Sequence, residues 1–110
     1  MPWSRRPVCG RLIRMNLPEP VLAQIRSLAA IPEVETVLLF GSRARGDNAP
    51  RSDVDLAVRC PTADALVWDR IVDRLDNART LLEIDVVRLD RAGADLARRI
   101  EKEGVVVYER

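Results

Sequence analysis

Two acidic side chains on an expected strand have the spacing that metal-assisted chemistry needs. Asp53 and Asp55 alternate with Val54 in the run DVDLAV. On a strand, residues two apart point to one face, with Cα atoms about 6.5–7 Å apart. Carboxylates so placed can hold metal ions about 3.5–4 Å apart, as two-metal phosphoryl chemistry requires. Without a cation they repel each other, and one resists ionisation. The alternative is a solvent-facing strand edge with its acids outside.

A third acid stands in a similar pattern further along the chain. Asp85 lies within EIDVV, where an acid flanked by apolar strand residues is less expected than one in a loop. Glu83 shares its face and competes for the same role, but Asp85 is nearer the centre of the expected strand. If this strand lies beside the one that carries Asp53 and Asp55, Asp85 completes a triad of carboxylates. An outward-facing position is again the alternative.

A glycine-serine pair follows directly after an apolar run that we expect to be a strand. A glycine at the end of a strand lets backbone approach a ligand closely. The amides after Gly41 can bind phosphate oxygens, especially if residues 43–46 begin a helical turn, and the Ser42 hydroxyl can donate one more hydrogen bond. The alternative is that the pair only forms a tight turn.

The hydrophobic pattern predicts the sheet that these residues need. Apolar residues at three- and four-residue spacing predict helices, and runs of β-branched and apolar residues predict strands. The expected helices cover about 17–30, 63–76 and 91–103, and the expected strands cover 34–40, 53–58, 82–89 and 105–108. Thr62 and Asp90 are expected to cap the second and third helices. With a helical turn after Gly41, the order α-β-α-β-α-β-α-β predicts an α+β fold, a small mixed sheet backed by helices.

Composition excludes several kinds of site. The 110 residues include no histidine and 2 cysteines that form no CxxC pair, which excludes a Cys/His zinc site and a histidine base. A metal must then be held by carboxylates, which favours Mg²⁺ or Mn²⁺. The 18 Lys and Arg residues are interleaved with 17 Asp and Glu residues, so no basic stripe indicates direct nucleic-acid binding.

The length fits one domain with a flexible arm before it. Residues 1–15 have two prolines, a glycine and four arginines without usable periodicity, so we expect a flexible arm there and the domain over 16–110. No apolar run approaches the ~18 residues of a membrane span, and the N-terminus lacks the apolar segment of a signal peptide. We therefore expect a cytoplasmic protein without membrane contact or disulfide.

These motifs resemble those of a known superfamily. Gly41-Ser42, ten further residues and then Asp53-Val54-Asp55 is similar to the signature of the DNA polymerase β-like nucleotidyltransferases. The run LLFGSRARGDNAPRSDVDLAV looks like their minimal nucleotidyltransferase (MNT) branch, as does the tail IEKEGVVVYER, so the resemblance covers about residues 17–110. Many members are MntA-type antitoxins of HEPN/MNT toxin–antitoxin pairs, in which the small protein adenylylates a tyrosine of the HEPN toxin, a ribonuclease.

The resemblance implies a set of catalytic, metal-binding carboxylates. Asp53 and Asp55 would bind two Mg²⁺ ions, with Mn²⁺ as the alternative. Asp85 would be the third ligand and could accept the proton of the attacking hydroxyl. At the motif positions the chain does not depart from the family's pattern, but the additional substrate domain of larger members is missing.

The resemblance also implies a nucleotide-binding segment. Gly41 and Ser42 would hold the triphosphate of ATP, and Arg43 is expected to bind the nucleotide with them. Arg45 and Arg51 stand in the same loop, where they could contact phosphates or an acidic partner. The alternative for all three arginines is a solvated loop face.

The function that the resemblance implies is adenylyl transfer from ATP to a hydroxyl, expected to be a tyrosine of a partner HEPN toxin. The short chain supplies a nucleotide and metal half but no acceptor half, so the acceptor is expected to arrive as another protein, with a homo- or hetero-oligomer as the assembly. One alternative is an antitoxin that neutralises its partner by binding alone. A second alternative is transfer to a small-molecule hydroxyl in a pocket formed between subunits. A third is a structural role in which every acidic side chain lies on the surface.

Overall fold

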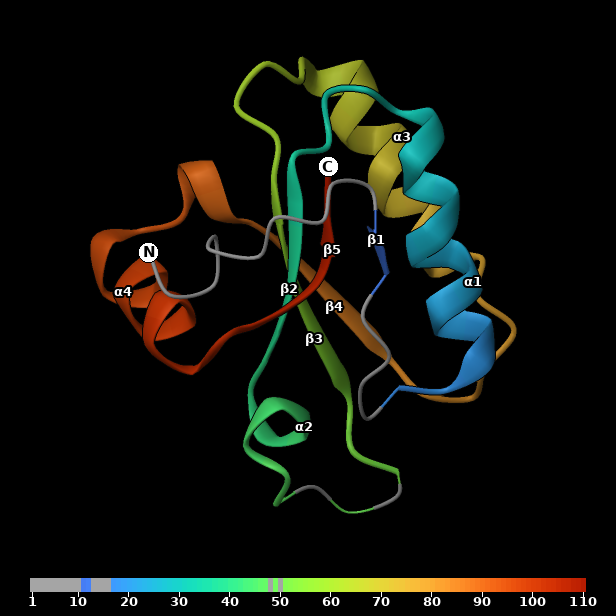
Figure 1. The fold of residues 1–110 in the computed structure, drawn as a ribbon, viewed down its shortest axis with the longest axis vertical. Helices are drawn as coiled ribbons and strands as arrows, with labels where there is room; N and C mark the ends of the chain where they lie inside the picture. The colour runs from blue at the N-terminus through green and yellow to red at the C-terminus, as the bar shows by residue number, and fades with distance from the viewer. Residues whose placement is uncertain (1–10, 13–16, 48, 50) are drawn as a thin grey trace.

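Helices and strands alternate along the chain in the computed structural model, which describes residues 11–12, 17–47, 49 and 51–110 (Figure 1). Within these residues, no helix is long and apolar enough to cross a lipid bilayer. In chain order, with η marking a short 3-10 helix, the elements are β1 (Arg11–Leu12), α1 (Glu19–Ser27), η2 (Leu28–Ala30), β2 (Thr36–Phe40), α2 (Ser42–Arg45), β3 (Val54–Arg59), α3 (Ala65–Asp76), β4 (Ile84–Arg88), η3 (Leu89–Arg91), α4 (Ala94–Glu103) and β5 (Val105–Glu109).

One five-stranded sheet forms the middle of the molecule, in the order β1-β5-β2-β3-β4. All neighbouring strands are antiparallel except β3 and β4, which are parallel. The sheet is therefore mixed, and the α+β class predicted from the sequence is confirmed. The parallel pair matters for the site, because parallel strands begin at the same edge of a sheet.

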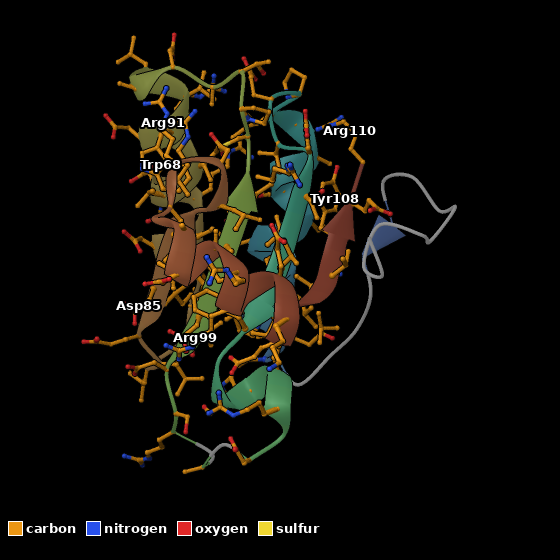
Figure 2. All side chains as sticks on the ribbon, turned by 90° about the vertical axis from the view of Figure 1, so that its left-hand side faces the viewer. Trp68, Asp85, Arg91, Arg99, Tyr108 and Arg110 are labelled. Carbon is orange, nitrogen blue, oxygen red and sulfur yellow. The ribbon has the colours of Figure 1, made fainter. Side chains whose placement is uncertain are left out.

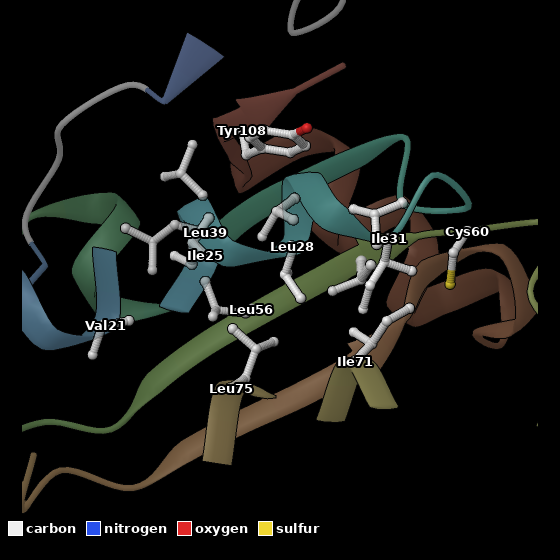
Figure 3. Close-up of a cluster of buried hydrophobic side chains, with 14 of the residues drawn as sticks. Val21, Ile25, Leu28, Ile31, Leu39, Leu56, Cys60, Ile71, Leu75 and Tyr108 are labelled. Atoms are coloured by element: carbon white, nitrogen blue, oxygen red, sulfur yellow. The ribbon is translucent and has the colours of Figure 1, made fainter. Parts of the chain in front are cut away.

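The larger hydrophobic core lies between the sheet and the helices α1 and α3, which cover one face of it (Figures 1 and 3). Because alternate residues of a strand point to one face, β2 and β3 each send every second side chain into this core. Burying an aliphatic side chain of this size contributes about 1.5–3 kcal/mol. Side chains at its centre include Val21, Ile25, Leu28, Leu39, Leu56, Ile71 and Leu75.

Helix α4 covers the opposite face of the sheet (Figure 1). Ile100 is fully buried there in a smaller cluster with Phe40 of β2 and Ala57 of β3. Asp55 stands two residues before Ala57, so it points to the same face of β3. The sheet pattern thus places the Asp55 carboxylate on the side of the sheet that α4 covers.

The two residues predicted to cap α3 and α4 are not the N-caps of these helices in the structure. The cap of α3 is Asp64, whose carboxylate accepts a hydrogen bond from a first-turn amide at 2.8 Å, so the prediction of Thr62 was wrong. Asp90 does not cap α4. Instead it lies in η3, where it accepts a hydrogen bond from the Cys60 amide at 3.0 Å and pairs with Arg88 at 3.1 Å. The Cys60 amide is brought to Asp90 from thirty residues away along the chain, whereas Arg88 is a neighbour in sequence. Helix α4 begins only at Ala94.

The element boundaries differ from the expected ranges at two places that matter. Residues Arg11–Leu12 of the predicted flexible arm form β1, paired with β5, and the rest of the arm lies outside the described residues. Strand β3 begins at Val54, so Asp53 is the last residue of the preceding loop. The two acids of the Asp-x-Asp motif therefore stand on either side of the strand's first residue.

Candidate active site

Asp55 and Asp85 lie directly opposite each other on neighbouring strands. The parallel register of β3 and β4 pairs these two residues, and the antiparallel register of β2 and β3 pairs Asp55 with Phe40, the residue before Gly41. The adjacency of the two strands, on which a carboxylate triad depends, is therefore present. Figure 2 shows Asp85 toward the end of the sheet where α2 lies. Asp53, one residue before β3, is exposed at the same end.

Gly41 provides both the backbone turn and the space beside Asp55. Its φ of +76° lies in a region that L side chains rarely adopt. A Cβ atom at this position would collide with Oδ2 of Asp55 and lie 3.2 Å from its Cγ. The turn leads at once into α2, which begins at Ser42. Only glycine therefore lets the end of β2 and the start of α2 pass this close to the carboxylate.

The electrostatics of the site converge on Asp55. Burial raises the pKa of its carboxyl group, and the carboxylates of Asp85 and Asp53 raise that pKa further. Arg99 and Arg45 act in the opposite direction. Burial and nearby like charges disfavour the ionised form of such a carboxyl group, and a bound cation stabilises that ionised form. The arrangement therefore suits a cation-binding carboxylate.

Helix α4 places two charged residues, Arg99 and Glu103, beside the site, and the sequence analysis did not predict them. Arg45 in α2 places Nη1 3.4 Å from Oε2 of Glu103, and Arg99 places Nε 3.7 Å from the same oxygen. One carboxylate of α4 thus links arginines from two elements that are far apart in sequence. Arg99 and Asp85 both lie toward the α2 end of the sheet (Figure 2). The sequence signal for this pair, an Arg and a Glu four residues apart on a helix, also fits an ordinary exposed face.

The predicted nucleotide-binding segment has one member with an unexpected environment. Ser42 is half-buried and is the first residue of α2, the helical turn expected after Gly41. Arg43 is only 5% exposed, and its Nε donates a hydrogen bond to the backbone oxygen of Ser52 at 3.1 Å. Arg43 is therefore not part of a solvated loop face. It ties α2 to the residue that precedes Asp53, and its contact with nucleotide stays a prediction.

The acids of the site have the donor chemistry of a Mg²⁺ or Mn²⁺ site. Carboxylate oxygens are the ligands that these hard cations prefer. Asp85 faces Asp55 across the strand pair, and Asp53 is close enough to raise the pKa of Asp55. In the part of the chain that the structure describes, no group of three or more Asp, Glu, Cys or His side chains is arranged to hold a metal ion as it stands. The three carboxylates fit a divalent cation by their chemistry and lie at one end of the sheet, and the ligand set itself remains a prediction.

Comparison with protein families decides the class of the chain. The family model described as "Polymerase beta, Nucleotidyltransferase" matches residues 24–110. The chain belongs to this nucleotidyltransferase family. The match includes Gly41, Ser42 and all three acids of the site, and it confirms the enzyme class predicted from the sequence. No curated protein is similar enough in sequence to count as a match.

Solved structures with a similar fold contain toxin–antitoxin complexes. One chain, from a crystal structure of a toxin–antitoxin with AMP-PNP, is 25% identical with a TM-score of 0.64; the alignment covers 84% of this chain and 73% of that one. Another, from a tri-AMPylated Shewanella oneidensis HEPN toxin in complex with an MNT antitoxin, is 23% identical with a TM-score of 0.60, covering 84% and 71%. The second likeness shows the fold alone. Together they support the polymerase β-like fold that the sequence predicted.

Proposed function

We propose that this chain is a Mg²⁺-dependent adenylyltransferase that modifies a tyrosine hydroxyl of a partner HEPN toxin and thereby acts as its antitoxin. The observation that carries the proposal is the pairing of Asp55 with Asp85 across β3 and β4, with Gly41 packed against Asp55. The AMP-PNP and the AMPylated HEPN toxin of the similar structures support ATP as the substrate and a HEPN protein as the partner. We expect this chain to work in the cytoplasm and to make no direct contact with nucleic acid itself.

The metal ions would be held by Asp53, Asp55 and Asp85. Bound there, they would neutralise the triphosphate and make the acceptor hydroxyl more acidic. The raised pKa of Asp55 supports this assignment, because a carboxylate that is partly buried and close to two other carboxylates gains most from a neighbouring cation.

The residues of the chain have separate tasks in the proposed transfer. The acceptor oxygen forms a bond to the α-phosphorus of ATP, and the bond from that phosphorus to the bridging oxygen of pyrophosphate breaks in line with it. Asp85 accepts the proton of the acceptor hydroxyl. Gly41 and Ser42 bind the triphosphate through backbone amides and the hydroxyl group, with Arg43 beside them.

A transfer assay tests this function. The purified chain is incubated with α-labelled ATP, Mg²⁺ and the HEPN protein encoded beside it, and the label is followed into protein. We expect labelling of the HEPN protein by the wild type, loss of at least about 10²-fold in Asp53→Ala, and wild-type labelling in Asp69→Ala, a change of an exposed acid on α3. Absence of transfer by the wild type, or equal transfer by Asp53→Ala, overturns the proposal.

A toxicity assay separates catalysis from binding. Asp55→Ala removes the most buried of the three carboxylates, and we expect it to lose protection of cells that express the toxin. Full protection by Asp55→Ala, with no AMP on the toxin, would mean that the antitoxin acts by binding alone.

A further inference from the structure

A cavity of about 470 Å³ opens beside Asp53, on the side of the site away from Gly41. It is lined by Arg51, Asp53, Thr80, Leu81, Leu82 and Glu83. The amide of Val54 donates a hydrogen bond to the backbone oxygen of Glu83 at 2.9 Å, so the segments that enter β3 and β4 are held side by side. The cavity therefore shares one of the proposed metal ligands but belongs to the β4 side of the site.

The in-line geometry of the proposed transfer indicates that the acceptor enters on the β4 side of the site. At this end of the sheet Gly41 follows β2, Asp53 precedes β3, and the cavity loop precedes β4. The triphosphate is proposed to bind at Gly41, so pyrophosphate leaves on the β2 side. Attacking and leaving oxygens lie roughly in line in phosphoryl transfer. The acceptor therefore approaches from the β4 side, where the cavity lies.

The lining of the cavity indicates the chemistry of its occupant. The side chain of Leu81 is fully exposed at 101%, whereas its neighbour Leu82 packs against the core. Asp53 and Glu83 are both exposed and bring negative charge, with Arg51 as the cation of the lining. Two carboxylates repel the phosphates of a nucleic-acid strand. A neutral or basic polypeptide segment with an apolar side chain fits both the charges and the leucine.

We propose that this cavity is the acceptor subsite, in which Leu81 contacts an apolar side chain that neighbours the acceptor hydroxyl on a partner polypeptide. This inference rests on the proposed adenylyl transfer, for which Asp53, Asp55 and Asp85 remain the catalytic groups. Leu81 is a specificity-determining residue, and its contribution is confined to binding of the acceptor.

The test compares Leu81→Asp with Leu66→Asp. Leu66 is the other exposed large hydrophobic residue among those described, and it lies in the first turn of α3, away from the cavity. Three quantities are measured for each variant: the KM for the HEPN protein, the kcat, and the affinity for an ATP analogue with Mg²⁺. Because burying a leucine is worth about one to two powers of ten in affinity, we expect the KM of Leu81→Asp to rise about tenfold or more. The kcat of Leu81→Asp and its affinity for the ATP analogue should be unchanged. Leu66→Asp should behave as wild type. Leu81→Met, which keeps an apolar side chain, should retain most of the affinity for the HEPN protein.

Each other outcome has a definite meaning. An unchanged KM in Leu81→Asp, with an active wild type, overturns the acceptor subsite alone. Weaker binding of the ATP analogue in Leu81→Asp assigns the cavity to the nucleotide and also overturns it. An RNA oligonucleotide with a 3′-hydroxyl serves as the rival acceptor, and labelling of that RNA in place of protein overturns the polypeptide assignment. A wild type that labels no acceptor overturns the proposed function itself, and this inference with it.

Discussion

Gly41 lies so close to Asp55 that a Cβ atom at position 41 would collide with the carboxylate oxygen Oδ2. The contact joins the end of β2 to the second residue of β3, and it fixes the distance between the proposed triphosphate-binding turn and the proposed metal-binding acid. The backbone of Gly41 also has a positive φ. A substitution at position 41 is therefore expected to act on both sides of the site at once.

We expect Gly41→Ala to destabilise the protein by about 1–3 kcal/mol and to abolish binding of ATP with Mg²⁺, because the new methyl group strains the backbone and displaces Asp55. Gly46→Ala is the matched control, since Gly46 has a φ of +84° but open space around its Cβ position. It should cost about 1–2 kcal/mol through backbone strain and leave nucleotide binding intact. Urea unfolding and titration calorimetry measure both effects. Retention of binding in Gly41→Ala would show that the close contact is not needed.

The raised pKa of Asp55 predicts that this residue lowers stability at neutral pH when no divalent cation is present. An acid with a raised folded-state pKa makes the folded protein bind protons more tightly than the unfolded chain does. Its contribution to the free energy of unfolding therefore falls as pH rises from about 3.9 through the raised value. We expect Asp55→Asn to be more stable than wild type at pH 7 in EDTA, with the difference shrinking toward pH 3.

Thermal unfolding across this pH range, with and without Mg²⁺, measures the difference. Mg²⁺ should raise the midpoint of the wild type and leave that of Asp55→Asn unchanged. Asp69→Asn, on the exposed side of α3, is the control and should follow the wild type in both conditions. An Asp55→Asn protein less stable than wild type in EDTA at pH 7 would contradict the prediction.

Arg99 is expected to support ionisation of Asp55 from across the site. Removing the positive charge in Arg99→Gln should raise the pKa of Asp55 further, because Arg99 lowers it in the intact protein. Carbon-detected NMR titration of the Asp55 carboxyl group measures the change. Arg98→Gln removes the same charge from the neighbouring helical position, where Arg98 lies 3.8 Å from Asp95, and should have a smaller effect. Equal shifts in the two variants would mean that only net charge matters.

Arg88 is expected to hold the other end of the sheet together without affecting the chemistry. Its Nη2 donates hydrogen bonds to the backbone oxygens of Cys60 at 3.0 Å and Ala63 at 2.7 Å, and its guanidinium lies 5.8 Å from the ring centre of Trp68. Arg88→Ala should lower the free energy of unfolding by at least about 1.5 kcal/mol, whereas Arg91→Ala, a change of an exposed neighbour, should stay within about 0.5 kcal/mol. Urea unfolding tests both, and the affinity for ATP should be unchanged in each variant.

Local patterns in the sequence predicted most of the elements, because side-chain periodicity and glycine or proline boundaries act over a few residues. The strands that carry Asp55 and Asp85 were recognised this way, and the spacing from Gly41-Ser42 to the Asp-x-Asp motif was enough to suggest the family. The N-terminal caps of α3 and α4 were harder to predict from the sequence. The sequence predicts Asp90 as the cap of α4, whereas in the structure Asp90 accepts a hydrogen bond from the Cys60 amide, thirty residues away, and only the folded chain brings that amide to it.

The tertiary structure alone decided how the site is assembled. The sequence determined that Asp55 and Asp85 stand on strands, but the parallel pairing of β3 with β4 placed them opposite each other. The packing of α4 on the same face brought Arg99 and Glu103 to the site from about fifty residues away along the chain. These relationships depend on strand order and on which face each helix covers. Burial and hydrogen bonding across the whole sheet select that arrangement, and no short window of sequence contains it.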